Sequence, residues 1–138
     1  MPAPATPALR NGQLTHGWKL VLICGWVGVI LAFAAVWKSS WTLGFSTWWL
    51  GPQSDPRFVG LLVLPFVIAI GVLVLALANV RYAAIVGIVG AVGLINVAWG
   101  DVGRQIKFAV IEFSVAGGAL LISAACLAGM VRGGDDPR

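Results

Sequence analysis

Residues 58–99 read FVGLLVLPFVIAIGVLVLALANVRYAAIVGIVGAVGLINVAW, and this stretch decides the fold of the chain. It contains a single charged residue, Arg81, which divides it into two uncharged runs, 58–80 and 82–100. With a helical rise of about 1.5 Å per residue, either run is long enough to cross a hydrocarbon layer of about 30 Å. We therefore predict a transmembrane helical hairpin with a tight turn at Asn79-Val-Arg-Tyr82.

The composition of the whole chain is that of an integral membrane protein. Of its 138 residues, 59% are hydrophobic and only 10% are charged, whereas a typical globular domain carries about 25% charged residues. The net charge of +4 is spread along the chain without a basic cluster, so nucleic-acid binding is not expected. The excess of Arg over Lys, with abundant Gly, Ala and Val, indicates a bacterial source, and we expect the protein in the cytoplasmic (inner) membrane.

Two further apolar runs complete the predicted fold, an all-α polytopic membrane protein with a four-transmembrane-helix bundle. Its helices are expected at about 19–37, 58–80, 82–100 and 104–131. They form a transmembrane domain over residues 18–131, which follows a disordered head, 1–17, and precedes a polar tail, 132–138. Pro65 is expected to kink the second helix near its start. For the first run a cleaved signal peptide is an alternative, because Ala32-Phe33-Ala34 resembles a cleavage site.

Small residues follow one face of three predicted helices. Those on the first helix are Gly25, Gly28, Ala32 and Ala35, and a separate bulky stripe contains Trp26, Phe33 and Trp37. Those on the third are Ala83, Gly87, Gly90 and Gly93, and those on the fourth are Ser114, Gly117, Gly118, Ala125, Ala128 and Gly129. Since small residues let helix backbones approach closely, we predict that these faces point into the bundle and that the bulky stripe faces lipid.

The connection between the first two helices is a Trp-rich segment that contains a candidate partner surface. Trp41, Phe45, Trp48 and Trp49 recur at helical spacings, which predicts one side of a short helix lying in the membrane interface. Aromatic residues at that level commonly anchor a protein at the lipid headgroups. The alternative is a docking surface for a partner or a lipid.

Glu112 is the only charged residue inside an apolar run and is the candidate for transport chemistry. Ionisable side chains in membranes are costly and often functional, so Glu112 would handle a proton or cation, with Asn96 as a second candidate. The interpretation that we favour is an interfacial Glu112 that stays hydrated or pairs with Arg104 or Lys107. Asn96 is then expected to hydrogen-bond between helices, and Asp101 to cap the last helix.

The sequence contains no set of residues for catalysis or cofactor binding. His16, the only histidine, lies before the predicted helices, which excludes Ser-His and Cys-His pairs within the bundle. No cluster has metal-ligand spacing, and no phosphate-binding loop motif occurs. We therefore expect a protein that is not an enzyme and that has no cofactor.

An even number of helices places both termini on one side of the membrane. That side would carry Arg10, Lys19, Arg81, Arg132 and Arg138, and the other side Lys38, Arg57, Arg104 and Lys107. The positive-inside rule therefore favours cytoplasmic termini.

The function that these observations favour is a small accessory, assembly or stabilising subunit of a larger membrane complex. Its partners would be the lipid bilayer and other membrane protein subunits or further copies of itself. The first alternative is a small oligomeric transporter or channel that uses Glu112, and the next is a membrane-embedded enzyme acting on lipids.

Overall fold

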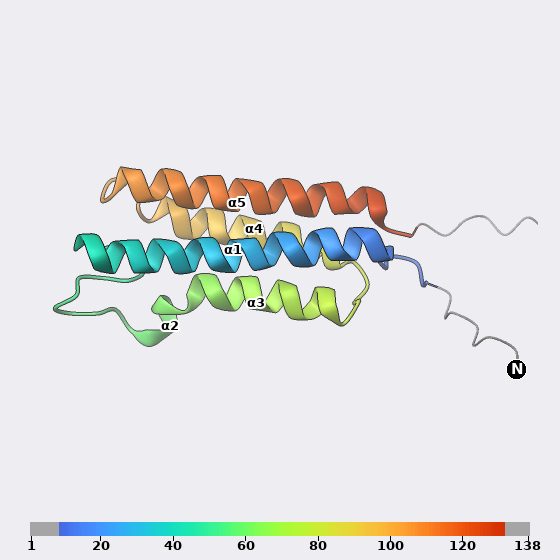
Figure 1. The fold of residues 1–138 in the computed structure, drawn as a ribbon, viewed down its shortest axis with the longest axis horizontal. Helices are drawn as coiled ribbons and strands as arrows, with labels where there is room; N and C mark the ends of the chain where they lie inside the picture. Colours follow the sequence, from blue (N-terminus) through green and yellow to red (C-terminus); the bar gives the residue numbers. More distant parts are fainter. Residues whose placement is uncertain (1–8, 132–138) are drawn as a thin grey trace, which may run out of the picture.

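The computed structural model describes residues 9–131, in which four long helices form a bundle (Figure 1). These helices are α1 (His16–Leu43), α3 (Leu64–Leu77), α4 (Ala83–Trp99) and α5 (Ile106–Cys126). A one-turn helix, α2 (Val59–Leu62), precedes α3, and a short 3-10 helix, η1 (Leu127–Gly129), follows α5. Within the described residues every named element is a helix, so the all-α prediction is confirmed.

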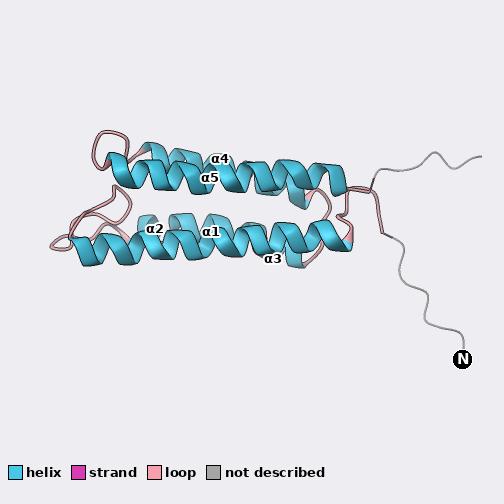
Figure 2. Cartoon of the chain, turned by 45° about the horizontal axis from the view of Figure 1, so that its top comes forward, coloured by secondary structure: helices cyan, strands magenta, loops and turns pink. Residues whose placement is uncertain are grey.

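The long helices run alternately in opposite directions and lie in two layers. α4 and α5 form one layer, and α1 lies beside α2 and α3 in the other (Figure 2). α1 packs against α3 and α5, and α4 packs against the same two helices. The described chain enters and leaves at one end of the bundle, whereas connections 44–58 and 100–105 lie together at the opposite end (Figure 1).

Two of the helices, α1 and α5 extended by η1, are long and apolar enough to cross a membrane. α3 and α4 are also apolar but have 14 and 17 residues, which corresponds to about 21 and 26 Å of helix. α3 is short because the chain bends at Val63, and Pro65 then lies in the first turn of the new helix. A proline is tolerated there because its missing N–H would have no partner in any case.

The turn between α3 and α4 lies where the sequence predicts it. Asn79 and Tyr82 both adopt positive φ angles, of 50° and 62°. The Tyr82 N–H donates to the carbonyl oxygen of Gly12 at 2.8 Å. Gly12 has a φ of 83°, and a Cβ there would lie only 3.0 Å from the Tyr82 ring, so both the backbone and the packing require a glycine.

Residues 12–15 bind to the bundle rather than forming part of a disordered head. The Gly12 N–H donates to Val131 O (2.9 Å), the Val131 N–H to Gln13 O (2.9 Å), and the Thr15 N–H to Gly129 O (3.1 Å). Leu14 is buried between them. We call residues 12–15 and 129–131 the terminal clasp. The expected head, 1–17, is therefore wrong for residues 12–17, while residues 1–8 and the tail, 132–138, lie outside the described part.

The bulky face of α1, which is predicted to face lipid, points into the bundle instead. Its buried residues are Leu22, Trp26, Val29, Phe33, Val36 and Ser40. Gly28 and Ala35, from the predicted small face, are exposed. The indole of Trp26 explains the rotation, because its Nε1–H donates to Ser123 Oγ on α5 at 3.2 Å and so finds a partner that lipid does not supply.

Like α1, α5 turns its predicted small-residue face away from the bundle core. Its buried residues are Phe108, Ala109, Glu112, Ala116, Ala119, Ser123 and Cys126. Ser114, Ala125 and Ala128 are exposed, so the small face predicted for this helix points largely outward. Burying Glu112 and Ser123 lets both polar groups find hydrogen-bond partners inside the bundle, which outweighs the closer backbone approach that glycines would allow.

The glycine face of α4 points into the bundle, as predicted. A Cβ at Gly87 would lie 2.5 Å from Ser123 Oγ, and one at Gly90 would lie 2.8 Å from Val72 and 3.0 Å from Trp26. The Trp26 ring therefore occupies space that exists only because α4 carries glycines at these positions.

Candidate functional site

The Trp-rich segment does not form the separate interfacial helix that its spacing predicts. α1 continues through Trp41 and ends at Leu43, and it is followed by Gly44, whose φ of 71° is typical of the residue that caps a helix C-terminus. The chain then crosses the end of the bundle as an irregular loop (Figure 1). Trp41 and Phe45 are 57% and 48% exposed, whereas Trp48 is partly buried and Trp49 fully buried. The four candidate interface residues therefore do not share one surface.

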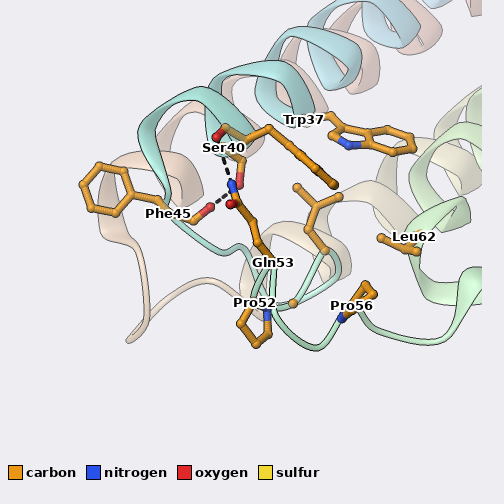
Figure 3. Close-up of a pocket in the computed structure, with 10 residues that line it drawn as sticks. Trp37, Ser40, Phe45, Pro52, Gln53, Pro56 and Leu62 are labelled. Carbon is orange, nitrogen blue, oxygen red and sulfur yellow. Dashed lines mark hydrogen bonds between the residues drawn. The ribbon is translucent and has the colours of Figure 1, made fainter.

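Two hydrogen bonds connect this loop to α1 beside a small pocket (Figure 3). Ser40 Oγ donates to Phe45 O, and Gln53 Nε2 donates to Trp41 O at 2.9 Å. The other walls of the pocket are mainly apolar and are formed by Trp37, Leu50, Gly51, Pro52, Pro56 and Leu62. The pocket lies between the end of α1 and the loop and stays separate from the acidic groups described next.

Glu112 lies in the core of the bundle beneath Trp49. Both side chains are fully buried, and Trp49 Nε1–H donates to Glu112 Oε1 at 2.8 Å. The rings of Phe33, Trp37 and Phe66 surround the Trp49 ring at centroid distances of 6.2, 6.5 and 6.2 Å. The expectation of a hydrated Glu112 is therefore wrong, because its carboxyl is 0% exposed and its donor comes from the loop.

Asp101 holds the neighbouring part of the same loop. The Trp48 backbone N–H donates to Asp101 Oδ1 at 2.7 Å, and the Trp48 indole N–H donates to Val97 O. The Trp48 ring lies directly against Gly100, where any side chain would collide with it. Asp101 is thus used to fasten the loop to the end of α4. It does not cap α5 as predicted, because the N-cap of that helix is Gln105.

Asp101 and Glu112 lie within hydrogen-bonding range of each other. Both residues are 0% exposed, and one oxygen of each, Asp101 Oδ2 and Glu112 Oε2, has no hydrogen-bond partner within residues 9–131. Burial raises the pKa of Asp101 above its ordinary value, and the Trp48 N–H, Glu112 and the charge of Arg104 offset this only in part. We call Asp101, Glu112, Trp48 and Trp49 the acidic site.

Asn96 is not part of the acidic site. It is exposed, and its Nδ2 donates to Val92 O, one turn earlier in α4, at 2.9 Å. The predicted hydrogen bond from Asn96 to another helix is therefore replaced by a bond within its own helix. Of the two candidates for transport, only Glu112 lies in the core, and Asp101 is the polar residue beside it.

The acidic site is suited to holding charge or a proton. Its two carboxyl groups accept from the Trp48 backbone N–H and from the Trp49 indole N–H, whereas the Trp48 indole N–H is directed to Val97 O. Within the described part of the chain, no three His, Cys, Asp or Glu side chains are close enough together to bind a metal ion. His16 begins α1 and so lies at the other end of the bundle.

A second feature, on the outside of the bundle, is an apolar groove between α1 and α5. It is lined by Ala32, Ala35, Val36, Phe108 and Ile111. It widens toward the loop, where Leu43 and Phe45 form its apolar walls and Arg104 and Lys107 lie at its edge. Gly28 is exposed on the same face of α1, one turn before Ala32.

The sequence contained a signal for the acidic site that pointed to the wrong partners. A lone carboxyl in an apolar run requires polar partners, and closeness in sequence and positive charge favour Arg104 and Lys107. The donor in the structure is the indole N–H of Trp49, which is 63 residues away along the chain.

Comparison with protein-family models, with curated proteins and with solved structures finds no match to this chain. The function is therefore argued from the acidic site and the surface of the bundle.

Proposed function

We propose that this chain is a small, non-catalytic integral membrane protein that serves as an accessory, assembly or stabilising subunit of a larger membrane complex. The observation that carries the proposal is the outward small-residue face of α1, where Gly28, Ala32 and Ala35 follow the groove beside α5. Small residues give a lipid-facing surface no advantage, whereas a partner helix can approach closely along them. A transmembrane helix of another subunit would therefore pack in this groove.

In this proposal all four long helices cross the membrane. α3 and α4 pack against α1 and α5, so hydrocarbon that surrounds one pair would also surround the other. Their outward side chains are large and apolar, among them Val67, Val74 and Val89, each more than half exposed. A membrane adapts to helices that are slightly too short by local thinning, at a modest free-energy cost.

The proposed location is the inner membrane of a bacterium, with both termini in the cytoplasm. The distribution of basic residues favours this orientation through the positive-inside rule. The Trp-rich loop and the acidic site would then lie near the outer surface of that membrane.

The test is affinity purification of the tagged protein from its native membrane in a gentle detergent, followed by mass spectrometry. Gly28→Leu blocks the outward face of α1, and Gly71→Leu is its matched control on α3. Both glycines are exposed and a Cβ at either position meets no neighbouring atom within 4 Å, so we expect a leucine there to point outward and to leave the Tm unchanged. We expect the wild type and Gly71→Leu to retain a stoichiometric partner and Gly28→Leu to lose it. Recovery of further copies of this chain alone, with a discrete oligomer mass, would overturn the proposal.

One observation favours a second candidate, a small oligomeric transporter or channel that handles a proton or cation. This observation is the buried carboxyl pair, in which Asp101 replaces Asn96 as the companion of Glu112. The transporter hypothesis predicts that Glu112→Gln abolishes transport in proteoliposomes and leaves the fold intact. An accessory subunit would retain its partner in the same variant.

A further inference from the structure

The carboxyl groups of Asp101 and Glu112 are close enough to interact, and both are buried in the bundle. If both were ionised, two negative charges would lie together without water, since Asp101 and Glu112 are each 0% exposed. Such an arrangement is strongly unfavourable unless a cation or a proton compensates it.

The charged groups around the pair do not supply that compensation. Arg104, in the connection before α5, is the cation whose charge acts on Asp101, and it is exposed to solvent. Lys107 on α5, Lys38 on α1 and Arg57 in the loop are also exposed. α3 and α4, the other two helices of the bundle, contain no titratable side chain.

The hydrogen bonds leave two oxygen atoms without a partner. Asp101 Oδ1 accepts from the Trp48 backbone N–H, and Glu112 Oε1 accepts from the Trp49 indole. The other two oxygens, Asp101 Oδ2 and Glu112 Oε2, are buried without a partner within the described residues, although the two carboxyl groups are in hydrogen-bonding range. A single hydrogen atom between them would satisfy both.

We infer that Asp101 and Glu112 form a binding site for one proton, which the two carboxyl groups share, and that this proton holds the Trp-rich loop on the bundle. One carboxyl donates its O–H to the other, so the pair carries a single negative charge. The N–H groups of Trp48 and Trp49 stabilise that charge from the loop side. Loss of the proton leaves two adjacent negative charges, and opening of the loop to water relieves their repulsion. The site is a property of the bundle and does not depend on a partner.

The first test replaces the proton by an amide N–H. In Glu112→Gln, the side-chain oxygen can still accept from Trp49 while its NH₂ group donates to Asp101 Oδ2. Asp101→Asn can do the same in the opposite direction. We expect the Tm of the wild type in detergent to fall as the pH is raised, because the folded chain keeps a proton that the unfolded chain releases. In each single amide variant the Tm should no longer decrease as the pH is raised. In the matched control Asp55→Asn, at an exposed position, the Tm should decrease as in the wild type.

The double variant Asp101→Asn/Glu112→Gln provides the sharper prediction. While each amide oxygen accepts from its tryptophan N–H, the two NH₂ groups face each other as two donors, and one side chain must flip away from its tryptophan to make a donor–acceptor pair. We therefore expect a Tm below that of either single variant, although each single change is tolerated. A double variant as stable as the singles, or single variants as unstable as Glu112→Ala, would overturn the inference.

Infrared spectroscopy gives a direct measurement of the proton. The wild type should show the carbonyl stretch of a protonated, slowly deuterating carboxyl group, and either amide variant should lack this band. The same samples distinguish a proton from a metal cation. After chelation, Na⁺, K⁺ or Ca²⁺ is added to the wild type and to Glu112→Gln. We expect each cation to change the Tm of the two proteins by the same amount. A rise confined to the wild type would show that the site binds the cation and would overturn the proton assignment.

Discussion

At Trp49 a single indole nitrogen connects the loop to a carboxyl group in the bundle core. Its ring is held by Phe33 and Trp37 of α1 and by Phe66 of α3, so packing fixes where the nitrogen points. The Trp49 side chain thus contributes both a hydrogen bond and packing contacts. Substitutions can distinguish the two contributions to stability.

Trp49→Phe keeps a six-membered aromatic ring but removes the N–H donor together with the rest of the buried indole. We expect a loss of about 1–3 kcal/mol in the free energy of unfolding, because Glu112 Oε1 is then left buried without a partner. The measurement is chemical or thermal unfolding in detergent. The matched control is Trp99→Phe, since Trp99 is exposed and packs edge-on against Phe113. Equal losses in the two variants would show that the Glu112 hydrogen bond adds no measurable stability.

At the scale of the helices, α4 and its turn were predictable from the sequence, whereas the rotations of α1 and α5 were not. Gly87 and Gly90 have a close-approach role that spacing alone reveals. On α1 and α5 two requirements compete, because each helix also carries a polar group, Trp26 Nε1 or the Glu112 carboxyl, that must find a partner. Small-residue spacing does not show which requirement has the larger free energy.

The loop was least accessible to sequence reasoning. Helical spacing predicted one aromatic face, but Trp48 and Trp49 are placed by contacts with Val97, Asp101 and Glu112, which are 49, 53 and 63 residues away. No local pattern encodes those pairings. Trp41 does lie on a helix, but this helix is the end of α1 and not a separate one.

Gly90→Ala tests the packing of Trp26 against α4. The new methyl group would lie 2.8 Å from Val72 and 3.0 Å from Trp26, so we expect a destabilisation of about 1–3 kcal/mol. Gly71→Ala, at an open position on α3, should leave stability unchanged or raise it slightly. Comparison of Tm values in one detergent distinguishes the two. A neutral Gly90→Ala would contradict the close packing of Val72 and Trp26 against α4.

For the molecule as a whole, the proposed four crossings place the two ends of the bundle on opposite sides of the membrane. In a background without Cys24 and Cys126, Asp55→Cys and Asn11→Cys each introduce a thiol at an exposed position, one at either end. We expect a membrane-impermeant maleimide to label Asp55→Cys in intact cells, and Asn11→Cys only after permeabilisation. Labelling of both from the same side would contradict an arrangement in which all four helices cross.

The terminal clasp has a mechanical consequence. Because Gly12 and Gln13 are hydrogen-bonded to Val131, a force applied to the two ends of the chain is carried first by the clasp. The force reaches the helices only after those few hydrogen bonds break. It then separates α1 and α5, starting at the end of the bundle where the clasp joins them. The clasp is therefore a short contact that breaks under force before the helix bundle unfolds.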